Sequence, residues 1–288
     1  MNEFWPILFK ISLVIFMAGN LLDMGLRLNL TDAVRGLRDC RFVAYTLLWA
    51  FILCPALAYA ITLFVPLEQP YAIGLILLGV APCAPFVPLL VDKAKGDLGY
   101  TAAFMLLASV GTVVTMPFTV PLLAKGLTAS AWAIAKPLLI VVLIPMAVGV
   151  IINAKSSAIA SKMLPFVKKT AGLAGLVFCL SMLVIYGKGL LGLAGQLAVA
   201  AELIFFGIVV IGTYLLTPGL PPAQKTVLSI GVTTRNMGAS LTPLLAVPDM
   251  DQRATLMLVI SLPIMVLVAM LGAKFLGRAA APSPTGHN

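Results

Sequence analysis

The sequence is poor in charged residues. Asp, Glu, Lys and Arg make up 10% of its 288 residues, whereas 61% of the residues are hydrophobic. Soluble domains have about 25% charged residues and less than about 50% apolar residues, so this composition excludes a soluble globular protein and indicates a polytopic membrane protein. The apolar segments follow one another over short connections. We therefore expect one transmembrane domain over residues 1–278 and a polar C-terminal tail over residues 279–288.

Histidine and paired cysteines are almost absent. His287 is the only histidine and lies in the tail PSPTGHN, which excludes a histidine-based metal site or acid–base centre. The four cysteines lie in or beside apolar stretches without paired spacing, so we expect free cysteines that pack in the core; they are Cys40, Cys54, Cys83 and Cys179. The sequence contains no nucleophile–base pair and no Cys/His cluster. It therefore argues against an intramembrane enzyme and predicts neither a metal nor a cofactor.

Acidic residues are fewer than basic ones, 10 against 19, which gives a net charge of +9. In a soluble protein this excess would indicate nucleic-acid binding. Here the basic residues cluster in short loops beside apolar segments, where they set topology and attract anionic lipid headgroups. We expect membrane lipid as the partner of this charge, and no nucleic acid. The N-terminus, MNEFWPILFK, has no basic cluster and no small-residue cleavage site, which favours a first membrane span over a signal peptide.

Apolar runs of about 20 residues are long enough to cross the hydrocarbon core as helices. By that criterion we predict nine transmembrane helices, at residues 5–28, 41–64, 71–92, 99–124, 130–153, 166–187, 197–217, 223–247 and 254–276.

The basic residues alternate between the two sides of this arrangement. The connections after helices one, three, five and seven, with the C-terminal end, hold thirteen: Arg27, Arg35, Arg38, Arg41, Lys93, Lys95, Lys155, Lys162, Lys168, Lys169, Lys225, Lys274 and Arg278. The opposite connections hold Lys125, Lys188 and Arg253. The positive-inside rule then predicts a plasma (inner) membrane protein with its N-terminus outside and its C-terminus in the cytoplasm.

Two of the predicted helices contain residues that interrupt a helix. The third holds Pro82, Pro85 and Pro88, and each proline removes a backbone donor. The eighth reads LSIGVTTRNMGASLTPLL, with a polar run at its centre. Broken helices five apart in order cross the membrane in opposite senses, as expected for inverted repeats whose half-helices share one site. The alternative is ordinary proline kinks in a packed bundle, with the arginine of the eighth helix paired to an acid.

That arginine, Arg235, is the only charged residue from Val227 to Val247. A guanidinium at the centre of a membrane helix costs about 2.5–3.5 kcal/mol on the mildest scale, so a functional role is expected. An arginine at the shared site argues for an anionic substrate. The candidate substrate-binding residues are Arg235, Asn236, Thr234, Thr233, Pro82, Cys83, Pro88 and Gly231.

Several short motifs follow one another along the chain. The third helix contains Pro82 and ends in Ala94-Lys95-Gly96-Asp97. The others are Ile230, Val232 and Asn236 in the eighth helix, Met24-Gly25-Leu26 with Leu28, Leu143-Ile144-Pro145 with Gly149, and Ala223-Gln224-Lys225. In order and spacing, these motifs resemble the bile acid:sodium symporter family over about residues 11–275.

The resemblance implies a panel domain and a core domain, with the two broken helices crossing in the core. Substrate would bind in the cleft beside that crossing, and alternating access would move one domain against the other. Such proteins take up bile acids or smaller organic anions, usually with sodium. Some relatives have ten spans, whereas we predict nine here.

The sequence departs from the family pattern where the family binds sodium. The resemblance assigns oxygen ligands to positions that are here Ala50, Val87, Pro88, Met105, Gly231 and Arg235; Thr101 keeps its hydroxyl. Sodium binding needs several oxygen ligands, so we carry no sodium site over. We expect Arg235 to replace the bound cation. Transport would then be facilitated, exchange-type or proton-coupled.

Two acidic residues in the predicted helices, Asp23 and Glu202, are candidates for proton coupling. The alternative is a structural role for each, as an ion-pair partner of Arg235 or as a side chain that reaches the interface near a helix end. Two other functions stay open: a sodium symporter with a rebuilt ion site, and a ligand sensor that keeps the transporter fold without transport.

Overall fold

The computed structural model describes residues 4–127, 129–193, 197–245, 247 and 251–279. These residues fold into helices joined by short connections, without a strand. Seven helical stretches are long and apolar enough to cross a membrane, at residues 4–27, 40–64, 98–123, 131–155, 157–187, 198–215 and 252–277. The chain is therefore a multi-pass, all-helical membrane protein, as predicted.

Five of these stretches are continuous helices: α1 (Phe4–Arg27), α7 (Leu98–Leu123), α10 (Ser157–Leu193), α11 (Ala198–Leu215) and α14 (Gln252–Ala279). The other two contain a π-helical turn. In one, α3 (Cys40–Leu48), η1 (Trp49–Leu53) and α4 (Cys54–Phe64) follow one another, and in the other α8 (Ala131–Leu138), η2 (Leu139–Leu143) and α9 (Ile144–Lys155) do. Each π-turn closely precedes a proline, Pro55 or Pro145, which cannot donate to the preceding turn.

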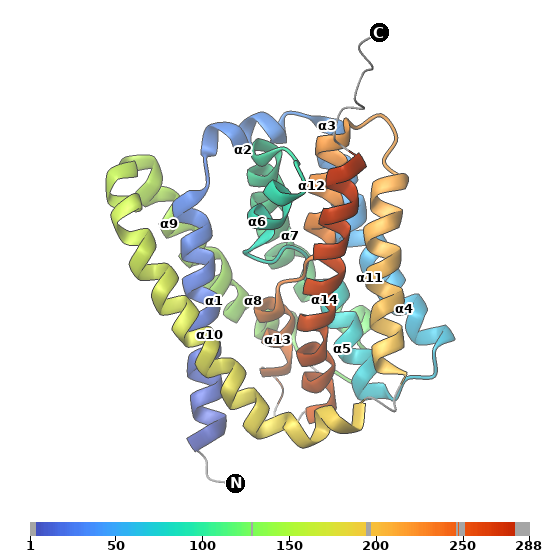
Figure 1. Cartoon of the computed structure of the whole chain (residues 1–288). Helices are drawn as coiled ribbons and strands as arrows, with labels where there is room; N and C mark the ends of the chain where they lie inside the picture. The colour runs from blue at the N-terminus through green and yellow to red at the C-terminus, as the bar shows by residue number, and fades with distance from the viewer. Residues whose placement is uncertain (1–3, 128, 194–196, 246, 248–250, 280–288) are drawn as a thin grey trace.

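One predicted boundary was wrong, and one short helix was missed. The sixth predicted helix does not begin at residue 166: α10 begins at Ser157, where Ser156 Oγ accepts a hydrogen bond from Ile159 N. The basic residues that indicated a loop, Lys162, Lys168 and Lys169, lie on its outer surface instead. A short helix, α2 (Leu30–Leu37), was not predicted. Asn29 caps it, and in Figure 1 it lies across the upper end of the molecule.

The two predicted interruptions are present. The third predicted helix consists of α5 (Gln69–Gly79) and α6 (Val87–Lys93), and the eighth consists of α12 (Pro222–Thr233) and α13 (Met237–Leu245). An 11-residue helix such as α5 is about 17 Å long, roughly half the hydrocarbon thickness. In Figure 1, α5 and α6 rise while α12 and α13 descend. The total of nine spans and the inverted repeat stay predictions.

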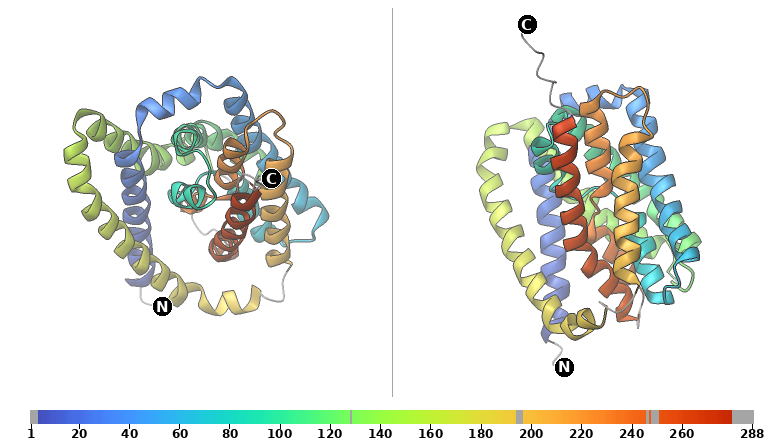
Figure 2. Two further views of the ribbon diagram at one scale, coloured as in Figure 1. Left: turned by 45° about the horizontal axis from the view of Figure 1, so that its top comes forward. Right: turned by 45° about the vertical axis from the view of Figure 1, so that its right-hand side comes forward.

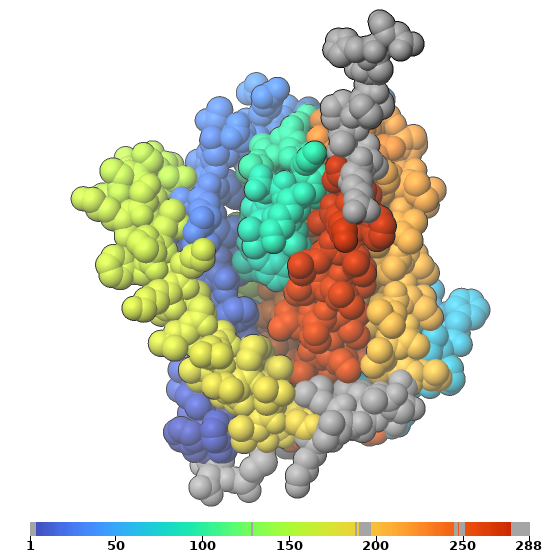
Figure 3. Space-filling model, in the orientation of Figure 1, coloured from blue at the N-terminus to red at the C-terminus, as the bar shows by residue number. Residues whose placement is uncertain are grey.

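The helices form two groups with a hollow between them. In the first group, α1 packs against α9 and α10, and Figure 2 shows α10 along the outer side of α1. The contact with α9 is close, because a Cβ on Gly25 would lie 2.2 Å from Met146 O and one on Gly149 would lie 2.6 Å from Leu22 O. In the second group, α14 packs against α5 and α11, and α11 against α12. Figure 3 shows the surface hollowed between α10 and α14.

Candidate functional site

The segments between the broken helices, residues 80–86 and 234–236, bind each other through their backbones. Cys83 N donates to Thr234 O over 2.9 Å, and Asn236 N donates to Ala81 O over 2.9 Å. Pro82 and Arg235 thus form an isolated antiparallel bridge. Irregular backbone at membrane depth needs partners within the protein, and here each break supplies partners for the other. We call this contact the crossover.

Side chains at the crossover complete the helix ends. Asn236 Oδ1 accepts from Ala239 N over 3.1 Å and so caps α13. Thr234 Oγ1 donates to Gly231 O, and Thr233 Oγ1 donates to Ser229 O, at the end of α12. Cys83 has a φ of 74°, which is uncommon for a residue with a Cβ and turns the chain toward α6.

Arg235 lies wholly inside the protein, with 0% of its surface exposed. Its Nη1 donates to Gly79 O over 3.3 Å, and Gly79 is the last residue of α5. The guanidinium therefore binds a carbonyl at the point where the third predicted helix breaks. The guanidinium carbon lies 5.1 Å from the centroid of the Phe205 ring, which is cation–π geometry. Nε and Nη2 have no hydrogen-bond partner among the described residues.

No carboxylate pairs with Arg235 within the described part of the chain. Asp23 instead forms a bidentate ion pair with Arg27, over 2.8 and 3.0 Å, near the end of α1. Glu202 is buried and its Oε1 contacts Ser261 Oγ. Of the structural roles predicted for the two acids, ion pairing to Arg235 is therefore wrong, and Asp23 is paired near a helix end.

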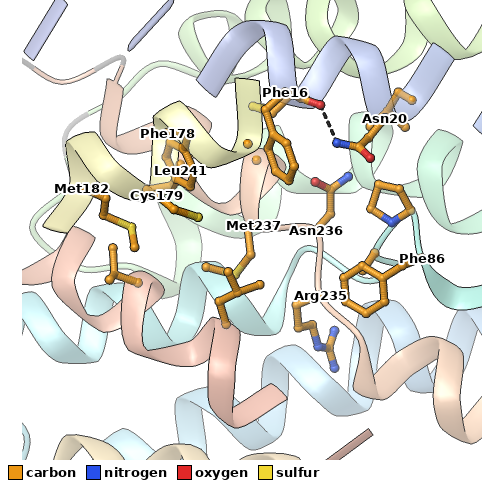
Figure 4. Close-up of a pocket in the computed structure, with 18 of the residues that line it drawn as sticks. Phe16, Asn20, Phe86, Phe178, Cys179, Met182, Arg235, Asn236, Met237 and Leu241 are labelled. Carbon is orange, nitrogen blue, oxygen red and sulfur yellow. Dashed lines mark hydrogen bonds between the residues drawn. The ribbon is translucent and has the colours of Figure 1, made fainter. Parts of the chain in front are cut away.

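A cavity of about 260 Å³ lies between the two helix groups, beside the crossover. Its wall is almost entirely apolar and aromatic, and the residues include Phe16, Met17, Leu21, Ala84, Pro85, Phe86, Phe178, Met182, Leu241, Val259 and Leu262. Two amides, Asn20 and Asn236, also line it. Figure 4 shows the Asn236 amide directed toward Asn20 and Phe16, while the Arg235 guanidinium points the opposite way. The charge of Arg235 is thus sealed behind the crossover.

The eight predicted substrate-binding residues do not all reach this cavity. Arg235 and Asn236 line it, Pro88 lines a second cavity, and five line neither: Gly231, Thr233, Thr234, Pro82 and Cys83. Those five are buried in the crossover or in the helix beside it. Residues of α1 and α10 that line the cavity, such as Phe16, Asn20 and Phe178, were not predicted from the sequence. Asn20 carried a usable signal, because it is a lone amide inside an apolar helix.

The second cavity, also about 260 Å³, lies at the ends of α1 and α7. It is more polar, since Asp23, Arg27, Asp32 and Thr101 line it with Pro88 and Met105. Pro85 lines both cavities and so lies at their boundary. Thr101 Oγ1 donates to Asp97 O in the first turn of α7.

Apart from Arg235 and Thr101, the positions to which the resemblance assigns sodium ligands carry apolar side chains or no side chain. Ala50, Val87 and Met105 are all buried. A Cβ on Gly231 would lie 2.4 Å from the ring of Phe104, so that ring occupies the space an acidic side chain would need. The described residues contain no cluster of three His, Cys, Asp or Glu side chains that could hold a metal.

Comparison with known proteins agrees with the family resemblance of the motifs. Residues 14–193 match the model of the sodium bile acid symporter family. The chain belongs to this family. It is also similar to a probable sodium/metabolite cotransporter, BASS2, of the chloroplast of Oryza sativa subsp. japonica, with 26% identity over 196 residues. That match covers 68% of this chain and 47% of the relative, so the chain spans about half the length of the relative. The family and this relative are both named as transporters.

Proposed function

We propose that this protein is a secondary transporter of a small organic anion, that it works by alternating access without sodium, and that Arg235 takes the place of the bound cation. The observation that carries the proposal is the buried guanidinium, bonded to Gly79 O at the crossover and without a carboxylate partner among the described residues. A fixed positive charge can hold carbonyl dipoles together where two broken helices meet, as a bound ion would. Unlike an ion it cannot dissociate, so it transmits no energy from a sodium gradient.

The filled ligand positions support sodium independence. Sodium is a hard cation that prefers several oxygen ligands. Val87, Met105 and the Phe104 ring beside Gly231 offer it none. Binding sodium at the crossover would also place a second positive charge near Arg235 in a region of low dielectric.

The cavity beside the crossover is the proposed substrate site. Its apolar wall fits an aromatic or alicyclic body, and the Asn20 and Asn236 amides can bind the polar end. Arg235 would act on the substrate through its electric field and not by contact, because its guanidinium faces away. A second substrate charge would be buried against apolar side chains, which favours a monoanion.

We propose the orientation with the upper end of Figure 1 in the cytoplasm. Basic residues gather at this end on α1, α2, α6 and α12, among them Arg27, Arg35, Lys93 and Lys225. The positive-inside rule assigns the more basic end to the cytoplasm. The more polar second cavity would then be the cytoplasmic exit.

The test uses the full chain in proteoliposomes, with pyruvate, phenylpyruvate, cholate and taurocholate as probes. We expect phenylpyruvate or cholate to bind more tightly than pyruvate, and to be taken up equally in sodium and in choline buffer. A loss of affinity of about tenfold in choline would show a rebuilt sodium site, for which the second cavity with Asp23 and Asp32 is the place to look. Binding of a probe without uptake would make the protein a sensor.

A further inference from the structure

Glu202 is a buried carboxyl group that does not line the proposed anion site. It lies in the second turn of α11 with 0% of its surface exposed. Its Oε1 contacts Ser261 Oγ on α14, and its Oε2 has no hydrogen-bond partner among the described residues. An ionised carboxylate in such a place is very costly, because nothing compensates the charge of Oε2.

The hydrogen-bond pattern around Ser261 fits the protonated acid. Ser261 Oγ lies within hydrogen-bonding distance of both Glu202 Oε1 and Met257 O, the latter at 2.8 Å. A serine hydroxyl has one hydrogen and so can donate to only one of these oxygens. If Glu202 is protonated, its O–H donates to Ser261 Oγ and the serine donates to Met257 O, so that both hydroxyl hydrogens are paired and the unpartnered Oε2 carries no negative charge.

Glu202 and Arg235 lie along the same seam between α11 and α14. On α11, Phe205 covers the guanidinium, and Glu202 is one turn away on the same face. On α14, Met265 Sδ accepts from Arg235 N, and Ser261 is one turn away. Any movement of α11 and α14 against the crossover therefore alters the surroundings of both groups together.

We propose that Glu202 is the proton-binding site of this transporter, neutral in the conformation described here and deprotonated when α11 and α14 shift against the crossover. The inference rests on the proposed transport function and names its coupling ion. In the step, the Glu202 O–H bond breaks, the proton passes to water in the opened seam, and the electron pair stays on the carboxylate. The carboxylate is then compensated by Nε and Nη2 of Arg235, once the shift moves the Phe205 ring off the guanidinium. One proton thus accompanies each anion.

Few other charged or titratable groups face this seam. The Cys54 thiol of α4 lies beside the Arg235 guanidinium. The charges on α14 nearest its start belong to Arg253, which pairs with Glu68 and Asp251 two turns before Ser261. Tyr71 of α5 lies near that cluster. Arg235 is the charged residue whose neighbours, Phe205 and Met265, lie one turn from Glu202 and from Ser261, so it is the charge that a shift of α11 and α14 would bring to bear on Glu202.

Infrared difference spectroscopy of the purified full chain in lipid nanodiscs, between acidic and alkaline buffer without substrate, tests the proton site. We expect a protonated-carboxyl C=O band that is lost in alkali, absent in Glu202→Gln, and shifted in frequency in Ser261→Ala. Asp23→Asn, which removes a carboxylate paired with Arg27 near a helix end, is the control and should keep the band. A Glu202→Gln spectrum identical to that of the parent would overturn the proposal.

The link to Arg235 is tested in the same spectra. Removal of the guanidinium in Arg235→Gln should let the band persist to higher pH, by about one unit, because a nearby positive charge favours the carboxylate. Since this change can unfold the protein, Phe205→Leu is the second variant: it removes the ring that covers the guanidinium on the side of α11, and the band should disappear at lower pH than in the parent. An unchanged titration in both variants would refute the coupling.

Proton movement is measured in proteoliposomes loaded with pyranine, with phenylpyruvate as the added anion and protein-free vesicles as the control. We expect the interior to acidify with phenylpyruvate uptake in the parent, and phenylpyruvate to exchange without a pH change in Glu202→Gln. Uptake without acidification in the parent would refute proton coupling while leaving anion transport intact. If phenylpyruvate does not move at all, the proposed substrate class fails, and the infrared titration still decides whether Glu202 binds a proton.

Discussion

At the scale of single residues, the molecule is organised around a buried positive charge whose guanidinium points away from the amide of Asn236. Arg235 occupies the contact between two broken helices, and its side chain donates a hydrogen bond to the carbonyl that ends α5. The side chain next to it, Asn236, faces the cavity instead. Arg235 and Asn236 thus face opposite sides, one toward the end of α5 and the other toward the cavity, because alternate side chains of an extended segment point to opposite sides.

Arg235→Ala should destabilise the protein and weaken anion binding. A hydrogen bond from a charged donor contributes about 1.5–3 kcal/mol, and its loss leaves Gly79 O without that partner. Arg235→Lys should restore only part of the loss, because an ammonium cannot stack on Phe205 as a planar guanidinium does. Thermal melting in nanodiscs and phenylpyruvate binding are the measurements.

The matched control for these variants is Arg253→Ala, an exposed arginine whose ion pairs lie at a helix end. Exposed pairs contribute about 0–1 kcal/mol, so its melting temperature should change little. If Arg235→Ala melts and binds phenylpyruvate like the parent, Arg235 has no part in the site.

Giving positions 231 and 235 the residues of sodium-dependent relatives should not restore sodium binding, because other ligand positions still lack oxygen. The double change Gly231→Glu with Arg235→Gln should remain only weakly responsive to sodium, because Val87 and Pro88 still supply no side-chain oxygen ligands. A Cβ at position 231 also meets the Phe104 ring at 2.4 Å, so even Gly231→Ala should lower stability by about 1–3 kcal/mol.

Gly207→Ala is the control for crowding at position 231, because a Cβ there meets nothing within 4 Å. It should be neutral or slightly stabilising, since alanine favours a helix over glycine. Adding Phe104→Ala should relieve the crowding of Gly231→Ala. A Gly231→Ala variant that melts like Gly207→Ala would show that Phe104 moves aside freely.

At the scale of helices, the features that could be predicted from the sequence are those with a local cause. Pro82 and the polar run at Thr233–Asn236 interrupt their helices whatever surrounds them, and both interruptions occur as predicted. The cavity could not be predicted in the same way. Phe16 and Phe178 are ordinary apolar residues of α1 and α10, and only the packing of those helices brings them to the crossover. The full length of α10 was missed because its lysines face outward.

The junction between α3 and α7 should weaken in acid. Asp39 caps α3 by accepting from Arg41 N and Phe42 N, and it accepts from the Tyr100 hydroxyl of α7 over 3.0 Å. Burial raises the pKa of Asp39, but the hydrogen bonds from Phe42, Tyr100 and Arg41 outweigh it and lower the pKa below its usual value. A lowered pKa means that this stabilisation is present above about pH 4 and is lost as the pH falls through the folded-state value.

Asp39→Ala should therefore lower the melting temperature at neutral pH. The expected loss of unfolding free energy is about 0.5–2 kcal/mol, as for other lost helix caps. The difference from the parent should shrink in acid, where the parent loses the same interactions. Asp39→Asn keeps an acceptor oxygen, so its melting temperature should lie between those of the parent and Asp39→Ala. A difference that is constant over the whole pH range would contradict this role of the Asp39 charge.

At the scale of the whole molecule, apolar side chains cover the outer sides of the helices and basic residues are concentrated at one end. The apolar flanks of the helices face outward, and the basic residues gather at the end where α14 finishes. Between the two helix groups, one apolar cavity and one polar cavity meet at Pro85. Since the two cavities share Pro85, we propose that an anion moves from the substrate site through the polar cavity toward the basic end, where the potential favours it.

The proposed orientation is tested with Cys40, an exposed cysteine at the start of α3 at the basic end. In intact cells a membrane-impermeant maleimide should not label Cys40, whereas after lysis it should label it fully. Cys54 and Cys83 are buried, so Cys40→Ala reports the background from the other cysteines. In the Cys40→Ala background, Lys125→Cys, placed just after α7 at the other end, should be labelled in intact cells. Labelling of Cys40 before lysis together with protection of Lys125→Cys would invert the assignment, and the polar cavity with Asp23 and Arg27 would then open to the outside as the entrance for the anion.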